Sequence, residues 1–160
     1  MIRMRPQLKY MRLAIKEARK NLKTLKGGPF GACIVRNNSV LAVAHNTVLE
    51  KDATCHAEVN AIRIASRKVR DFDLSGCIIY STTEPCPMCF SAIHWARLDA
   101  VIYGTNIADV KKLGFCELSI SAKDLKTKGK SSVKIFAHFD RDECKKLLDD
   151  WEKVEGREVY

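Results

Sequence analysis

The first part of the chain repeats apolar residues every three or four positions, with Lys and Arg between them. This spacing predicts one amphipathic helix that begins near Pro6 and is closed by Gly27 and Gly28. Its apolar stripe consists of Leu8, Met11, Ile15, Ala18, Leu22 and Leu25.

Short runs rich in Val, Ile and aromatic residues follow, and such runs are typical of β-strands. Residues 30–36 and 40–44 are separated by Asn37, Asn38 and Ser39, and this pattern predicts a hairpin. Three further strands are predicted at residues 77–81, 99–104 and 133–138.

Helical patterns lie between these strands. One helix is predicted over residues 56–68, with Asp52 or Thr54 available as its cap. Another is predicted over residues 87–97. Both begin shortly after predicted strands, and in α/β sheets functional sites gather where helices begin after the carboxyl ends of strands.

A final helix is predicted after the last strand, and Asp140 with Glu143 resembles a capping box at its start. Alternating strands and helices predict a three-layer α/β/α sandwich, and the hairpin makes its sheet mixed. We expect one domain over residues 1–160. The apolar positions of the last helix are Cys144, Leu147, Leu148 and Trp151.

Composition is that of an ordinary globular domain, with 46% apolar residues among 160. No apolar run approaches the roughly 18 residues of a membrane span, so no membrane partner is expected. The Arg-rich start resembles a mitochondrial presequence, but the helical stripe continues unbroken to Gly27. Seven cysteines without a secretory signal indicate reduced thiols, so a cytoplasmic location is expected.

Positive charge is concentrated in two stretches of a chain whose formal net charge is +9. Residues 1–26 contain nine Lys or Arg and a single acid, Glu17, and residues 123–134 form a second, lysine-rich stretch. Two interpretations stay open: a surface that binds nucleic-acid phosphates, or a solvated helix face followed by a polar loop.

Two cysteines, Cys86 and Cys89, stand three residues apart where a strand turns into a helix. At this spacing they share one helix face, and the free N–H groups of a first turn favour thiolates. Such a pair alone fits a redox dithiol, a disulfide or half of a structural zinc site.

A second motif, His56 and Glu58, opens the other inner helix. His56 together with Cys86 and Cys89 provides three zinc ligands and leaves a fourth position open, as a catalytic zinc ion requires. A carboxylate beside that position can move a proton between water and a leaving group, which makes Glu58 the catalytic candidate.

The combination of H-x-E with P-C-x-x-C resembles the cytidine deaminase superfamily, in the branch of tRNA adenosine, fungal cytosine and bacterial guanine deaminases. This resemblance implies a five-stranded sheet, one zinc ion per chain on His56, Cys86 and Cys89, and Glu58 as proton shuttle. It extends from about Gly28 to Gly114. Its segments are "GGPFGACIV", "HNTV", "HAEVNAIR" and "EPCPMCFSAIHWAR".

Within this branch the sequence resembles guanine deaminases most. The resemblance implies that Asn46, Trp95 and Phe30 contact the base and that Glu117 is a second catalytic acid. Bacterial guanine deaminases also end in a tyrosine, on a tail exchanged between the subunits of a homodimer. It therefore implies that residues 152–160, with Tyr160, cover a partner subunit's site.

Each of these roles has an ordinary alternative: Asn46 as a turn residue, Glu117 as a solvated acid, and Phe30 and Trp95 as buried packing residues. Departures from the family pattern, such as Ser91 where glycine is usual, put the substrate in question. The main rival is adenosine in a tRNA loop, followed by cytosine.

Two further alternatives have no deaminase activity. A zinc-stabilised RNA-binding module needs a metal site that a fourth protein ligand closes, and Cys116 or Cys144 is the candidate. A thiol oxidoreductase needs Cys86 and Cys89 as a metal-free redox pair. Deamination of guanine, a small purine base, is the function we expect.

Overall fold

Five strands form one mixed sheet at the centre of the computed structural model, which describes residues 5–160. Their order is β2-β1-β3-β4-β5; β1 is antiparallel to β2 and β3, whereas β3, β4 and β5 run parallel. The predicted hairpin is thereby confirmed. The strands are β1 (Gly31–Arg36), β2 (Ser39–His45), β3 (Cys77–Thr83), β4 (Ala100–Thr105) and β5 (Lys134–Phe136).

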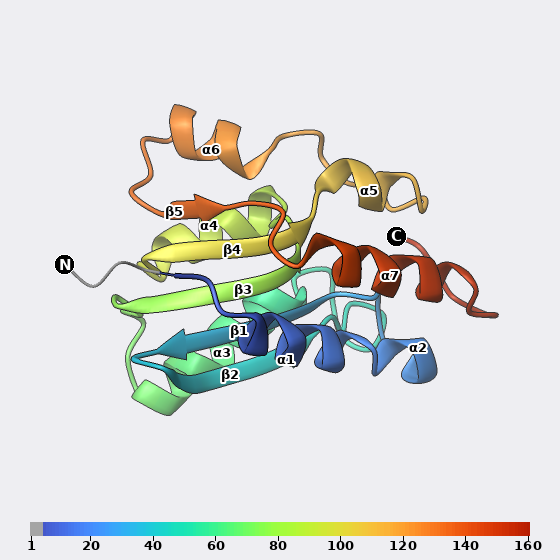
Figure 1. The fold of residues 1–160 in the computed structure, drawn as a ribbon, viewed down its shortest axis with the longest axis horizontal. Helices are drawn as coiled ribbons and strands as arrows, with labels where there is room; N and C mark the ends of the chain where they lie inside the picture. The colour runs from blue at the N-terminus through green and yellow to red at the C-terminus, as the bar shows by residue number, and fades with distance from the viewer. Residues whose placement is uncertain (1–4) are drawn as a thin grey trace.

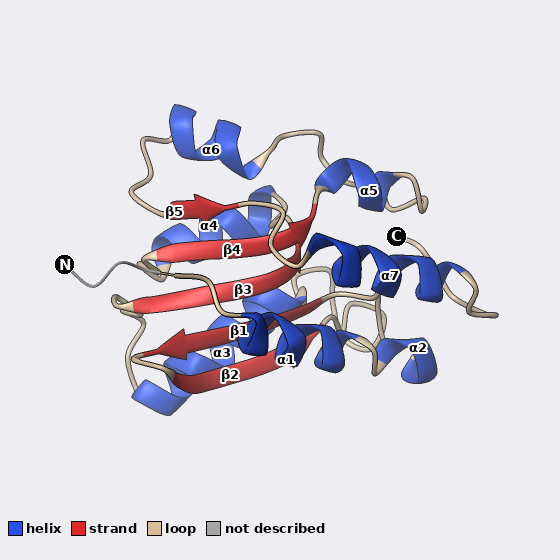
Figure 2. Cartoon of the chain, in the orientation of Figure 1, coloured by secondary structure: helices blue, strands red, loops and turns tan. Residues whose placement is uncertain are grey.

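Helices cover both faces of this sheet, which confirms the three-layer sandwich (Figure 2). Figure 1 shows α1, α2 and α7 in front of the sheet and α3 and α4 behind it. Among residues 5–160, every helix falls short of the length and apolar character that a membrane span requires. The helices are α1 (Leu8–Ala18), α2 (Asn21–Thr24), α3 (Ala57–Val69), α4 (Pro87–Trp95), α5 (Ile107–Lys111), α6 (Ala122–Lys128) and α7 (Arg141–Glu152).

The first predicted helix is in fact two helices, because the chain turns after α1 and resumes as α2. The predicted end at Gly27 and Gly28 is also wrong, since Leu25 adopts the left-handed conformation (φ 52°) and closes α2. Asn21, the first residue of α2, is buried, and its Nδ2 donates to the carbonyl oxygens of Gly28 (2.8 Å) and Asn46 (2.7 Å). These contacts form only when distant segments meet.

The predicted cap of α3 is wrong, and the predicted capping box of α7 does not form. The N-cap of α3 is His56, and Asp52 instead accepts a hydrogen bond from the Thr54 N–H within the preceding turn (2.7 Å). Asp140 is the N-cap residue of α7, as predicted, but its backbone is left-handed (φ 51°) and its side chain makes no capping hydrogen bond. Asp140 therefore forms no capping box with Glu143.

The short helices α5 and α6 lie where no helix was predicted. Both begin at side-chain caps: Asn106 forms a capping box with Asp109, and Ser121 accepts from the Asp124 N–H (3.0 Å). The first half of the lysine-rich stretch is therefore helical rather than a loop, up to Lys128.

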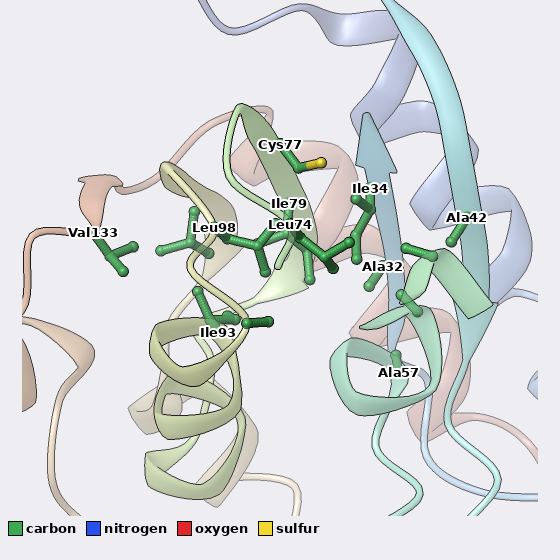
Figure 3. Close-up of a cluster of buried hydrophobic side chains, with 14 of the residues drawn as sticks. Ala32, Ile34, Ala42, Ala57, Leu74, Cys77, Ile79, Ile93, Leu98 and Val133 are labelled. Carbon is green, nitrogen blue, oxygen red and sulfur yellow. The ribbon is translucent and has the colours of Figure 1, made fainter. Parts of the chain in front are cut away.

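Buried apolar side chains fill the space on both sides of the sheet. Figure 3 shows Ala32 and Ile79 from the strands in one cluster with Ala57 of α3 and Ile93 of α4. A second cluster packs α1 and Cys144 of α7 against the opposite face. The first cluster holds the beginnings of α3 and α4 in fixed positions beside the sheet.

Candidate active site

The three predicted zinc ligands lie together at the beginnings of α3 and α4. His56 and Cys86 are the N-cap residues of these helices, and Cys89 lies in the first turn of α4. Their ligand atoms lie within 4.8 Å of one another, and Cys86 Sγ lies 3.6 Å from His56 Nδ1. Two ligands of one tetrahedral zinc ion lie about 3.5 Å apart, so the group fits this metal.

Local sequence explains why the two thiols meet there. β3 ends at Thr83, and the extended backbone of Cys86 leads directly into α4, whose first position is Pro87. Proline suits that position because its missing N–H has no helical partner to lose. Cys89 then follows one turn later on the same face as Cys86.

The surroundings shift the pKa values of the two thiols in opposite directions. The hydrogen bond from the Cys89 thiol, and next the contact with His56, lower the pKa of Cys86 to about 4. That same hydrogen bond, together with burial, raises the pKa of Cys89 well above its usual value. A divalent cation deprotonates a coordinating thiol, so this donor set has the chemistry of a zinc site.

Glu58 lies directly beside the ligand group and is only 6% exposed. Its carboxyl group contacts Ser81 Oγ (2.9 Å) and accepts from the Cys89 thiol (3.4 Å). Burial raises the pKa of Glu58. A carboxyl group with a raised pKa holds its proton more readily than an ordinary Glu, which suits a residue that takes and gives protons.

A cavity of about 290 Å³ opens at this group. Its volume is at the lower end of small-molecule sites, which are roughly 300–1,000 Å³. His56, Cys86 and Glu58 form its polar end. The remaining lining residues are Phe30, Asn46, Val48, Ala53, Thr83, Glu84, Phe115, Cys116, Glu117 and Tyr160.

Asn46 presents an unpaired donor in the cavity wall. The residue is fully buried, and its Oδ1 accepts from the Tyr160 hydroxyl (2.7 Å) and the Val48 N–H (3.0 Å). Its Nδ2 has no hydrogen-bond partner among the residues that the structure describes. A buried donor without a partner costs free energy, and an acceptor atom on a bound ligand would remove that cost.

Tyr160, the last residue, reaches the cavity of its own chain. Its hydroxyl donates to Asn46 and accepts from the Gly28 N–H (3.1 Å), and its carbonyl oxygen accepts from the Cys116 N–H (2.9 Å). Burial raises the pKa of Tyr160 to about 12, so its hydroxyl keeps its proton. Exchange of residues 152–160 between subunits stays a prediction.

Glu117 and Phe30 also line the cavity, as expected of base-contacting residues. Burial, and then the negative charge of Cys86, raises the pKa of Glu117 to about 7. Phe30 packs edge-on against Phe115, with ring centroids 5.2 Å apart. Their catalytic and binding roles stay predictions.

Trp95 lies outside this cavity. Its side chain is 78% exposed, so the alternative expectation of a buried packing residue is wrong. It lines a separate surface pocket with His94 and Leu125. The reason is its place at the last position of α4, a full helix length away from Cys86 and Cys89 at the helix start.

Several residues of the site were not predicted from the sequence. Ser81 contacts Glu58, Phe115 forms part of the apolar wall, and Glu84 lines the cavity with a side chain that is 7% exposed. Gly27 leaves room for Asn46: an added Cβ there would lie 2.1 Å from Asn46 Oδ1. Of these, only Glu84 carried a signal, because it lies directly before the P-C-x-x-C motif.

We predict that Cys86→Ala lowers the zinc content from one ion per chain to nearly none, because it removes one of three ligands. Zinc analysis of the purified protein measures this. Cys116→Ala is the matched control: Cys116 lines the cavity but does not belong to the ligand group. Loss of zinc in this control would contradict an open site and support a fourth protein ligand.

Comparison with known proteins agrees with this geometry. A family model described as the cytidine and deoxycytidylate deaminase zinc-binding region matches residues 4–105, which include His56, Cys86 and Cys89. Guanine deaminase of Bacillus subtilis is 41% identical over 107 residues, covering 66% of this chain and 69% of that protein. A probable cytosine deaminase of Schizosaccharomyces pombe is 33% identical over 143 residues, covering 86% of each.

A solved structure of a related protein has the same fold. A structure from a study of A-to-I editing by tRNA:A34 deaminases superimposes with a TM-score of 0.77 at 28% identity. The match covers 89% of this chain and 100% of that one. The matched family range and the ligand group thus agree on a zinc-binding deaminase, and the chain belongs to the cytidine and deoxycytidylate deaminase family.

Proposed function

We propose that this protein catalyses the hydrolytic deamination of guanine, in which guanine and water give xanthine and ammonia. The observation that carries the proposal is Tyr160 in the wall of a small cavity, hydrogen-bonded to Asn46. A free base of two fused rings suits an enclosed space of about 290 Å³, whereas a base in an RNA loop brings its backbone with it.

Hydrogen-bonding chemistry supports guanine over other bases. The free Nδ2 of Asn46 is a donor and suits the O6 or N7 acceptors of guanine. The carboxylate of Glu117 suits N–H donors, which guanine carries at N1 and at its amino group. A base without these groups leaves buried polar atoms unpaired, so the cavity rejects it.

The proton transfers fall to Glu58. His56, Cys86 and Cys89 would hold a zinc ion, which would supply water activated for attack at neutral pH. Glu58, 3.4 Å from Cys89 Sγ, takes the proton of the attacking water and passes it to a ring nitrogen, which makes C2 electrophilic. The water oxygen bonds to C2, and Glu58 takes the second proton from the resulting C2 hydroxyl. Glu58, directly or through Glu117, gives this proton to the amino group, the C2–N bond breaks, and ammonia leaves xanthine behind.

The runner-up is deamination of adenosine in tRNA, favoured by the net charge of +9 and by the tRNA deaminase relatives. The position of the first basic stretch argues against it. Three of its cations, Lys9, Arg12 and Lys16, lie on α1, in front of the sheet, whereas the helices that carry the zinc ligands lie behind it (Figure 1).

We predict that Glu58→Gln keeps its zinc but loses at least ~10²-fold in guanine turnover, because the amide cannot shuttle a proton. Xanthine formation and zinc content measured on the same sample test this. Glu50→Gln, an exposed residue paired with Lys26, is the control and keeps full activity. Undiminished turnover by Glu58→Gln removes Glu58 from the mechanism.

We predict that Tyr160→Phe lowers kcat/KM for guanine about 2- to 10-fold, the effect of one hydrogen bond, because Asn46 loses the donor that orients its amide. Tyr10→Phe is the control, since its hydroxyl donates to Asn38 outside the cavity.

We also predict that a chain that ends before Glu155 loses activity and retains zinc. An active truncated chain would contradict a role for the tail.

A further inference from the structure

Glu84 lines the cavity but has no part in the proposed proton transfers, which involve Glu58 and Glu117. We propose that Glu84 is a positioning residue: its buried carboxylate ties both ends of segment 107–122, which carries Glu117, to the strand that leads into Cys86. This inference rests on the proposed function, because it assigns the residue that fixes the base-recognising wall of the same cavity.

The contacts of Glu84 run to both ends of that segment. Its Oε2 accepts from the Ile107 N–H (3.1 Å), at the first residue of α5, and its Oε1 accepts from the Ala122 N–H (2.9 Å), at the first residue of α6. Its own N–H donates to the carbonyl oxygen of Thr105, the last residue of β4 (2.7 Å). One side chain therefore closes the segment into a loop.

Because Glu84 is buried, its carboxylate depends on the two backbone N–H groups that donate to it. Glu84 is 7% exposed, and no Lys, Arg or His lies within 4.0 Å of its carboxylate among residues 5–160. A buried carboxylate without a cation is costly unless hydrogen bonds compensate it, and bonds from N–H groups to a charged acceptor are the strong kind. Loss of either N–H partner therefore leaves an unfavourable buried charge.

The other contacts of the segment hold parts between its two ends: Asp109 pairs with Arg141 (2.8 Å), and the Cys116 N–H donates to the Tyr160 carbonyl oxygen (2.9 Å). Helices α5 and α6 have five and seven residues, too short to persist without tertiary contacts. Between them lie Phe115, Cys116 and Glu117, all in the cavity wall. The middle of the segment is held by packing of Phe115 on Phe30 and Trp151, while Glu84 fixes its ends.

The geometry gives Glu84 a defined effect on catalysis. It lies two residues before Cys86, so it links the zinc ligands and the Glu117 wall through one side chain. Glu84→Gln keeps the shape and one acceptor oxygen but sets an NH2 group against a backbone N–H. We expect the segment to loosen, so that Glu117 no longer meets the base in one fixed position.

A double-mutant cycle of Glu84→Gln and Glu117→Gln tests this. The readouts are kcat/KM for guanine and the Kd for xanthine by calorimetry, with zinc content and melting temperature measured on each variant. We expect Glu84→Gln to weaken both readouts about 10-fold when Glu117 is present, the worth of one charged hydrogen bond, and less than about 3-fold when Glu117 is already Gln.

The control is Asp124→Asn, which disturbs the start of α6 through Ser121 without touching the cavity. We expect its effect to be the same with and without Glu117. The proposal would be overturned if Glu84→Gln changed kcat/KM and Kd by the same factor whether residue 117 is Glu or Gln. Loss of zinc in Glu84→Gln would also overturn it. Glu84→Asp, shorter but still charged, goes through the same cycle if Glu84→Gln fails to fold.

Failure of the two proposals is distinguishable. If the wild-type protein neither converts guanine nor binds xanthine, the proposed function fails. The cycle is then measured with the base that the wild-type protein does deaminate, and coupling between Glu84 and Glu117 is judged there.

Discussion

The site depends on the meeting of two helix beginnings beside one sheet. His56 directly precedes α3, and Cys86 directly precedes α4. Cys86 Sγ lies 3.6 Å from His56 Nδ1 although thirty residues separate the two in the sequence. A zinc site with three ligands tolerates little displacement, because its bonds are only about 2.0–2.3 Å long. The core between the sheet and these helices, with Ala57 and Ile93 on the helix side, therefore serves the metal geometry as well as stability.

Around this centre the wall of the cavity comes from distant parts of the chain. Asn46 follows β2, Glu117 lies between α5 and α6, and Tyr160 ends the chain. Two of them are held through their carbonyl groups: the Asn21 side chain donates to the Asn46 carbonyl, and the Cys116 N–H donates to the Tyr160 carbonyl. The metal group is thus built from two local motifs, whereas the recognition surface requires the complete fold.

This difference explains what the sequence could predict. The strands and the long helices followed from hydrophobic periodicity, and the ligands followed from two short motifs at helix beginnings. The contacts of Asn21 at the start of α2 could not be predicted, because folding brings the carbonyl groups of Gly28 and Asn46 to its side chain. Likewise α5 and α6 have too few residues for a periodic signal and depend on caps and on Glu84.

The residues of the recognition wall were harder to predict than the metal ligands for the same reason. Phe30 and Glu117 lie in the cavity, but Trp95 lies at the far end of α4, where helix geometry directs it to the surface. A motif shared with a family indicates which residues are present. It does not indicate which surface a helix end faces, since that depends on how the helix packs.

The most direct test of the account is ammonia release by zinc-loaded protein given guanine, guanosine, adenine, cytosine and unmodified tRNA in parallel. The account predicts release from guanine, with equimolar xanthine, and none from the other substrates. Release from tRNA or cytosine in place of guanine would contradict it, since the cavity would then serve another base although its zinc group is the same.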